Sequence, residues 1–124
     1  MDKTTESILV AVDDMFFAAK ILATAKTLGK TIERVKSTAE IQNYLDQKSP
    51  SLLLIDLNAT KFDAIDLIRA IKADKRLEKP FIVGFLSHVQ VDLKNRALEA
   101  GCNVVMPRSA FSQKLAEVLN GNIQ

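Results

Sequence analysis

The chain has 124 residues, a net charge of +2, 48% hydrophobic residues and 26% charged ones. This length predicts one domain with its own core, and the composition is that of a folded globule, not a disordered chain. The balanced charge gives no basic footprint for direct binding of nucleic acid or of an anionic membrane. A single cysteine and a single histidine exclude an internal disulfide and argue against a His-rich metal site. Residues 1–7 are polar, and no apolar run approaches the roughly 20 residues of a membrane span, so we expect a cytoplasmic protein.

Continuous apolar runs in the sequence predict strands that are buried on both faces of a parallel sheet. Four such runs are Ile8–Val12, Leu52–Ile55, Phe81–Leu86 and Val104–Met106. The segment Thr31–Lys36 has room for a fifth strand, and its charges suit an edge of the sheet.

Helical periodicity fills the intervals between these strands. The first apolar stripe begins at Phe17 and stops at Gly29, which is a good helix terminator. Further helices are expected after the capping-box sequence 37–40, after Asp63, over Val91–Ala100, and after Ser109. Strand–helix alternation repeated five times predicts an α/β fold with a doubly wound parallel sheet, as a single domain over 1–124 with a core of about 8–119.

Polar residues follow the predicted strands at their carboxyl ends, where doubly wound sheets bind ligands. Asp13 and Asp14 follow the first strand, Asp56 ends the third, Ser87 follows the fourth, and Arg108 follows the fifth. Carboxylates packed together repel one another, and a hard divalent cation such as magnesium relieves that repulsion. The pattern therefore predicts a metal-dependent site at this edge.

Most of these residues also have a purely structural interpretation. Asp13 or Asp14 could cap the following helix, Ser87 could be another cap, and Arg108 could be a surface cation. Asp56 fits such a role least, because an apolar strand carries it to the edge of the sheet.

The order and spacing of these residues resemble the receiver domain of bacterial two-component response regulators (CheY-like), from about Ile8 to Leu119. That family has an acidic pair after the first strand, a phosphoacceptor aspartate at the end of the third, and a Ser or Thr after the fourth. Its basic residue lies seven positions after an Ala-Gly pair, as Arg108 does here relative to Gly101. The resemblance implies the flavodoxin-like receiver fold, with strand order 2-1-3-4-5 and five helices.

The resemblance also implies a role for each matching residue. Mg²⁺ would be bound directly by Asp14 and Asp56, through water by Asp13, and by the backbone carbonyl of Asn58. Asp56 would take a phosphoryl group from a phosphohistidine on a partner protein. Ser87 and Arg108 would contact that phosphoryl group, which suits a reaction that depends on positioning and charge neutralisation.

Several positions depart from the family's pattern. Arg108 replaces the usual Lys, and this swap exchanges a point charge for a planar, bidentate group. Ser109 replaces the Pro that usually follows through a cis bond, so we expect a trans bond here. Val105 replaces the switch aromatic, so the fifth strand has no ring to swing toward Ser87. His88 stands where a small residue is usual, and it could narrow access to the site, contact the phosphate, or be an exposed loop residue. Thr60 and Ala64 replace the usual Pro and Gly.

Two functions are consistent with this pattern. One is a response regulator receiver that is phosphorylated on Asp56 in a phosphorelay, with a sensor histidine kinase or phosphotransfer protein and a downstream protein target as partners. The other is a pseudo-receiver that serves as a phosphorylation-independent interaction module. Neither is an enzyme beyond catalysing its own phosphorylation and dephosphorylation. A flavin enzyme lacks its phosphate-binding turn here, and a haloacid-dehalogenase-like phosphatase would need a second Asp at position 58. A homodimer and a longer parent protein are left open.

Three side chains carry further predictions. Cys102 is expected to be a packed, unreactive thiol. Arg108 is expected to pair with Asp56 and to lower its pKa. Phe16 is expected either to point into solvent as a partner-binding anchor or to fold half-buried onto the last helix.

Overall fold

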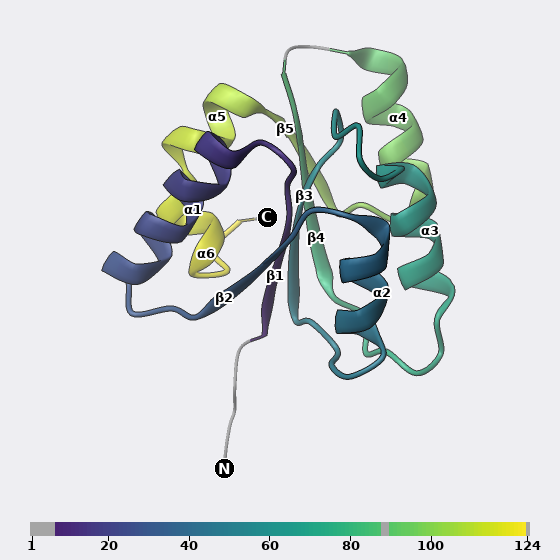
Figure 1. The fold of residues 1–124 in the computed structure, drawn as a ribbon. Coiled ribbons are helices and arrows are strands. Elements are labelled where there is room, and N and C mark those ends of the chain that lie inside the picture. The colour runs from purple at the N-terminus through teal and green to yellow at the C-terminus, as the bar shows by residue number, and fades with distance from the viewer. Residues whose placement is uncertain (1–6, 88–89, 124) are drawn as a thin grey trace.

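The computed structural model describes residues 7–87 and 90–123. Its centre is a five-stranded parallel sheet in the order β2-β1-β3-β4-β5 (Figure 1). The elements in chain order are β1 Ile8–Ala11, α1 Met15–Thr27, β2 Ile32–Val35, α2 Thr38–Leu45, β3 Leu52–Asp56, α3 Ala64–Ala73, β4 Phe81–Leu86, α4 Val91–Ala100, β5 Val104–Pro107, α5 Arg108–Gln113 and α6 Leu115–Leu119. The predicted fold class and strand order are confirmed.

Helices cover both faces of the sheet, with α1, α5 and α6 on one side and α2, α3 and α4 on the other (Figure 1). Successive strand residues point to opposite faces, so the two faces build separate cores. Leu53 and Ile55 of β3 pack into the core under α2, α3 and α4, whereas Leu54 packs with α1, α5 and α6. Both faces of the central strands are therefore apolar, as their continuous hydrophobic runs predicted.

The local sequence signals account for most element boundaries. Ser37 caps α2, with its Oγ accepting the Glu40 N–H at 3.2 Å, while the Glu40 carboxylate accepts the Lys36 N–H at 2.9 Å. Asp63 caps α3. Helix α4 ends at Ala100 and is capped by Gly101, whose φ of +125° favours glycine.

The last helix differs from the prediction. It begins at Arg108, not after Ser109, and is interrupted at Lys114, so the described residues contain six helices and not five. Pro107 stands at the cap position with a φ of −60°, which already suits a helix start, and this places Arg108 in the first turn. The described peptide bonds are all trans, as expected for the bond before Ser109.

Among the described residues, no helix is both long enough and apolar enough to cross a membrane.

Candidate functional site

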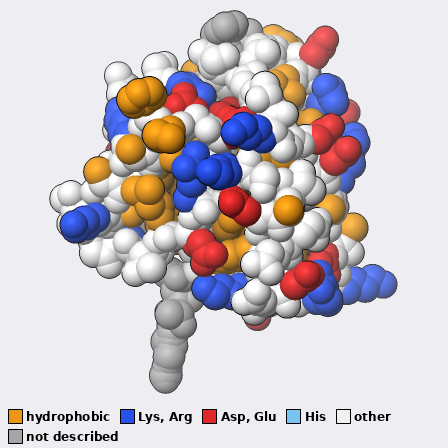
Figure 2. All heavy atoms as spheres, in the orientation of Figure 1, with side chains coloured by type: hydrophobic (Ala, Val, Ile, Leu, Met, Phe, Trp, Pro, Cys, Tyr) orange, Lys and Arg blue, Asp and Glu red, His pale blue; other side chains and the backbone are white. Residues whose placement is uncertain are grey.

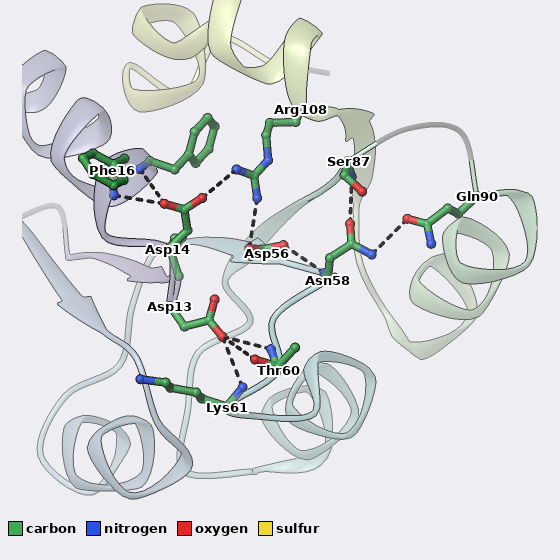
Figure 3. A network of polar contacts seen from close by, with 12 residues as sticks. Asp13, Asp14, Phe16, Asp56, Asn58, Thr60, Lys61, Ser87, Gln90 and Arg108 are labelled. Carbon is green, nitrogen blue, oxygen red and sulfur yellow. Dashed lines mark hydrogen bonds and ion pairs between the residues drawn. The ribbon is translucent and has the colours of Figure 1, made fainter.

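The predicted site residues converge at the carboxyl edge of the sheet (Figure 3). β1 leads into Asp13 and Asp14, β3 ends at Asp56, and β5 leads into Arg108 at the start of α5. Asp56 is the one charged residue that is buried among those the structure describes, with 2% of its surface exposed. Its place on a central strand explains this burial, because helices cover both sides of that strand.

Arg108 contacts two of the three carboxylates. Its Nη1 lies 3.1 Å from Asp14 Oδ2, and its Nη2 lies 3.3 Å from Asp56 Oδ2. The predicted pair with Asp56 is thus confirmed, and the pair with Asp14 was not anticipated. Because guanidinium presents several N–H donors in a fixed plane, one side chain can bridge two acids.

Two aromatic rings pack against the guanidinium of Arg108. Arg108 Cζ lies 4.5 Å from the ring centroid of Phe17 and 5.7 Å from that of Phe85. Phe85 stacks on Phe111 at 4.4 Å between centroids, and both rings are fully buried. Cation–π attraction adds to the two ion pairs here. Sequence reasoning assigned Phe17 to the core and missed this support, although a Phe in the first turn after the acidic pair could have signalled it.

Asp14 has a second partner set in the first turn of α1. Its Oδ1 accepts the N–H of Phe16 at 2.9 Å and the N–H of Phe17 at 3.1 Å, which makes it the N-cap. The structural alternative for this residue is therefore confirmed. The Oδ2 atom, which faces Arg108, is the part of Asp14 left for the site.

Asp13 is bound to the loop that follows β3. Its Oδ2 accepts the Thr60 N–H at 2.9 Å, the Thr60 hydroxyl at 3.3 Å and the Lys61 N–H at 3.2 Å. Thr60, at the position compared above with a Pro, thus donates both its N–H and its hydroxyl to Asp13. The acid therefore ties the end of β1 to the loop after the predicted phosphoacceptor.

Asn58 joins the loops that follow β3 and β4. Its N–H donates to Asp56 Oδ1 at 2.9 Å, its Oδ1 accepts the Ser87 N–H at 2.7 Å, and its Nδ2 donates to Gln90 Oε1 at 2.9 Å. Sequence reasoning missed Gln90, and a polar residue just before the apolar start of α4 is the signal that could have found it. Ser87 is exposed, and its contact with a phosphoryl group stays a prediction.

Arg108 lowers the pKa of Asp56 as predicted, but the net pKa of this acid is raised, so the expected overall lowering is wrong. Burial raises this pKa most, while the Asn58 N–H and the charge of Arg108 lower it, and the charges of Asp13 and Asp14 raise it again. Desolvation outweighs the ion pair because the carboxylate lies almost wholly out of water.

The pKa values of the two flanking acids move in the opposite direction. Burial raises the pKa of Asp13, but hydrogen bonds from Thr60 and Lys61 outweigh that effect and lower it. The pKa of Asp14 is lowered mainly by the Phe17 N–H and by the hydrogen bond from Arg108. Both acids are therefore held ionised, whereas Asp56 is pushed toward its neutral form.

The predicted Mg²⁺ site can be tested against these contacts. The residues supply oxygen atoms, as magnesium prefers. However, no three acidic, His or Cys side chains among residues 7–87 and 90–123 are arranged to hold a metal ion. The Oδ2 atoms of Asp14 and Asp56 instead point at Arg108 (Figure 3). In this arrangement the residues do not fit a metal ion.

The remaining predicted residues have distinct outcomes. His88 lies outside the described residues. Val105 is partly buried against the core under α2, α3 and α4, and offers no ring to the site. Phe16 is 88% exposed, so of its two alternatives the solvent-exposed one is confirmed and the half-buried one is wrong; its role as a partner anchor stays a prediction. Cys102 is buried beside Gly84, and burial raises its pKa to about 11, which fits a packed thiol; its reactivity stays a prediction.

No protein-family model and no curated protein matches the sequence, but many solved structures match the fold. A putative response regulator from Chloroflexus aurantiacus superposes with a TM-score of 0.84 at 18% identity, covering 96% of this chain and 98% of that one. The phosphorylated cyanobacterial phytochrome response regulator RcpA gives 0.78 at 22% identity, covering 95% and 91%. A response regulator from Burkholderia pseudomallei, whose structure holds a phosphorylated aspartic acid, a calcium ion and citrate, gives 0.79 at 14% identity, covering 92% of this chain and 66% of that one. The chain has the receiver fold.

This chain combines the receiver fold with an acidic pair after β1 and an aspartate at the end of β3. Arg108 bridges Asp14 and Asp56, and Asn58 connects Asp56 to the start of α4 through Gln90. At the carboxyl edge of the sheet, Asp56 therefore lies at the centre of a hydrogen-bond network, in contact with both Arg108 and Asn58.

Proposed function

We propose that the protein is a response regulator receiver that takes a phosphoryl group on Asp56 from a phosphohistidine of a partner protein. One observation carries this: Asp56 ends the central strand β3 and is the one buried charged residue among those the structure describes. A carboxylate buried beside a fixed cation, with an acidic pair next to it, is an arrangement suited to group transfer in this fold.

The chain's own residues supply a consistent chemical path. Asp56 Oδ2 attacks the phosphorus atom, the P–N bond to the imidazole breaks, and the imidazole leaves with the bonding electron pair. The Asn58 N–H holds Oδ1 at 2.9 Å, which fixes the plane of the carboxylate. Arg108 offsets the repulsion between the carboxylate and the anionic donor. The Ser87 hydroxyl is proposed to donate to a phosphoryl oxygen. Mg²⁺ is the cofactor that the resemblance implies. No step of this path is given to it, because the Oδ2 atoms of Asp14 and Asp56 contact Arg108 and do not fit a metal ion.

The test is an intact-mass measurement after incubation with acetyl phosphate, with magnesium and with a chelator. We expect wild-type protein to gain the mass of one phosphoryl group and Asp56→Asn to gain none. Asp66→Asn, which removes an exposed acid on α3, is the matched control and keeps the wild-type gain. No gain in wild-type protein under either condition contradicts the proposal.

A second candidate is a pseudo-receiver, and the bridging guanidinium favours it. The Asp56 side chain is only 3% exposed, and Arg108 contacts its Oδ2 atom at 3.3 Å. Arg108 therefore already neutralises the carboxylate and occupies the oxygen that would otherwise bind a metal ion or attack a phosphoryl group. In that case acetyl phosphate leaves Asp56 unmodified, and a partner binds wild-type protein and Asp56→Asn equally well.

The same proposal includes its partners and setting. A sensor histidine kinase or phosphotransfer protein would deliver the phosphoryl group in the cytoplasm, and a downstream protein target would read the modified state. The protein would catalyse no reaction beyond its own phosphorylation and dephosphorylation. Sedimentation of the protein before and after phosphorylation tests whether it forms a homodimer.

A further inference from the structure

The guanidinium of Arg108 is held on three sides. Two of its nitrogens contact the Oδ2 atoms of Asp14 and Asp56, at 3.1 and 3.3 Å. The ring of Phe17 lies beneath it, 4.5 Å from Cζ, and its Nε is buried with no hydrogen-bond partner among the described residues. The side chain is 29% exposed, so it is neither a free surface cation nor fully enclosed. Arg108 thus fills the space between two carboxylates (Figure 3).

The remaining oxygen atoms of these carboxylates are already bound to backbone groups. Oδ1 of Asp14 accepts two N–H groups of α1, and Oδ1 of Asp56 accepts the Asn58 N–H. The two N–H groups occupy both lone pairs of Asp14 Oδ1, and rotating the Asp56 carboxylate to bring its Oδ1 toward Asp14 would break the bond from the Asn58 N–H. A divalent cation shared by Asp14 and Asp56 would therefore need the two Oδ2 atoms that Arg108 now contacts.

We infer that Arg108 is the resident cation of this site, so that its guanidinium and a divalent cation exclude each other at Asp14 and Asp56. Arginine cannot release its charge by deprotonation, and its planar fork reaches two carboxylates at once. A lysine would bring one point charge on a flexible stem and could bridge them less well. The residue that replaces the usual Lys is then the one that decides whether metal binds. The competition between Arg108 and a metal ion is a binding equilibrium and does not depend on the proposed function. Only its consequence for phosphorylation of Asp56 rests on that proposal.

The test is a magnesium titration followed by calorimetry and by the amide resonances of Asp14, Asp56 and Asn58. We expect Arg108→Ala to bind magnesium at least tenfold more tightly than wild-type protein. Arg108→Lys keeps the positive charge but loses the planar guanidinium, so its magnesium affinity is expected to lie between those of wild-type protein and Arg108→Ala. Arg69→Ala, which removes an exposed arginine paired with Asp66 on α3, is the matched control and keeps the wild-type affinity.

Arg108→Gln covers the case in which Arg108→Ala fails to fold, because it keeps much of the side-chain volume and an N–H donor over the rings. The Nε–H resonance of Arg108 gives a second readout and should shift when magnesium saturates the wild-type site. Equal affinities in wild type and the Arg108 variants overturn the inference, as does saturation without a shift of that resonance. Absence of magnesium binding in every variant also overturns it. Failure of the proposed function is a different result, namely no phosphoryl mass gain on Asp56.

Discussion

At the scale of single residues, the site depends on a balance between burial and charge at Asp56. The raised pKa of this acid shows that desolvation exceeds the help from Arg108 and the Asn58 N–H. A group whose folded pKa lies above its unfolded value stabilises the fold in its protonated form. Its contribution is fully present below the unfolded pKa, and it is lost as pH rises through the folded pKa. The ionised Asp56 therefore weakens the fold at neutral pH.

The first prediction follows from that sign. Asp56→Asn is expected to raise the free energy of unfolding at neutral pH by on the order of 1 kcal/mol, because it removes a buried charge while keeping the shape of the side chain. The gain should shrink as pH falls below the folded pKa of Asp56. Urea unfolding of both proteins across this pH range is the measurement.

Asp66→Asn serves as the control, since this side chain is 73% exposed and the change should stay within about 0.5 kcal/mol. A loss of stability in Asp56→Asn at neutral pH would mean that the ion pair with Arg108 outweighs desolvation after all.

At the scale of elements, the start of α1 serves both the fold and the site. Asp14 caps the helix with one oxygen and contacts Arg108 with the other. A local sequence signal could identify the cap, because Asp is a preferred residue at that position. It could not identify the second contact, because Arg108 lies 94 positions away and reaches Asp14 only through the order of the strands.

The second prediction separates these two roles of Asp14. Asp14→Ala should lose about 1 kcal/mol of stability through the missing cap, in addition to the ion pair. Asp14→Asn keeps an oxygen for the cap and should lose less than Asp14→Ala, while it weakens the hold on Arg108. Thermal unfolding of the two variants beside wild-type protein gives the comparison, and equal losses would show that the cap contributes nothing.

The side chain of Asn58 joins the loops after β3 and β4. Asn58 accepts the Ser87 N–H at 2.7 Å and donates to Gln90 Oε1 at 2.9 Å, and its own N–H donates to Asp56, so it links Asp56 to the start of α4. The sequence did not predict this link, because an Asn side chain forms such bonds only in a fixed tertiary setting.

The third prediction concerns this link. Asn58→Ala should expose the Ser87 N–H to solvent and speed its hydrogen exchange, with a loss of about 1 kcal/mol in stability. Gln90→Ala removes only the second bond and should leave the Ser87 exchange rate close to that of wild-type protein. Equal exchange at Ser87 in all three proteins would show that Asn58 does not hold this loop.

At the scale of the whole molecule, the sequence predicted the sheet, its edge strand and which residues meet at its carboxyl edge. Apolar runs and helix caps are local, and the direction of parallel strands brings their ends together. The sequence did not predict three features: the bridge from Arg108 to two acids, the raised pKa of Asp56, and the interruption of the last helix at Lys114. The Arg108 bridge and the pKa of Asp56 follow from packing of segments far apart in the chain; nothing in the structure explains the interruption at Lys114.

The surface beside the site is apolar where α1 meets solvent. Figure 2 shows hydrophobic side chains over the region of α1, with basic and acidic side chains next to them. Met15 is 71% exposed and Phe16 is 88% exposed, while Phe17 turns inward against Phe85, 5.0 Å between ring centroids. Adjacent phenylalanines on one helix turn thus face solvent and core. An exposed aromatic this close to Asp14 adds nothing to the core and is suited to contact a partner.

The last prediction tests that contact with the two neighbouring rings as a matched pair. Phe16→Ala should weaken transfer from a partner phosphohistidine or binding of the partner at least tenfold, and should change the free energy of unfolding by less than about 0.5 kcal/mol. Phe17→Ala should instead cost about 2–4 kcal/mol of stability, because it removes a ring packed on Phe85 and on Arg108. Unfolding curves for both variants, with transfer or partner binding measured on the Phe16 variant, decide the question. If Phe16→Ala leaves transfer and binding at wild-type levels, the exposed ring is not the anchor, and the partner contacts the site from another side.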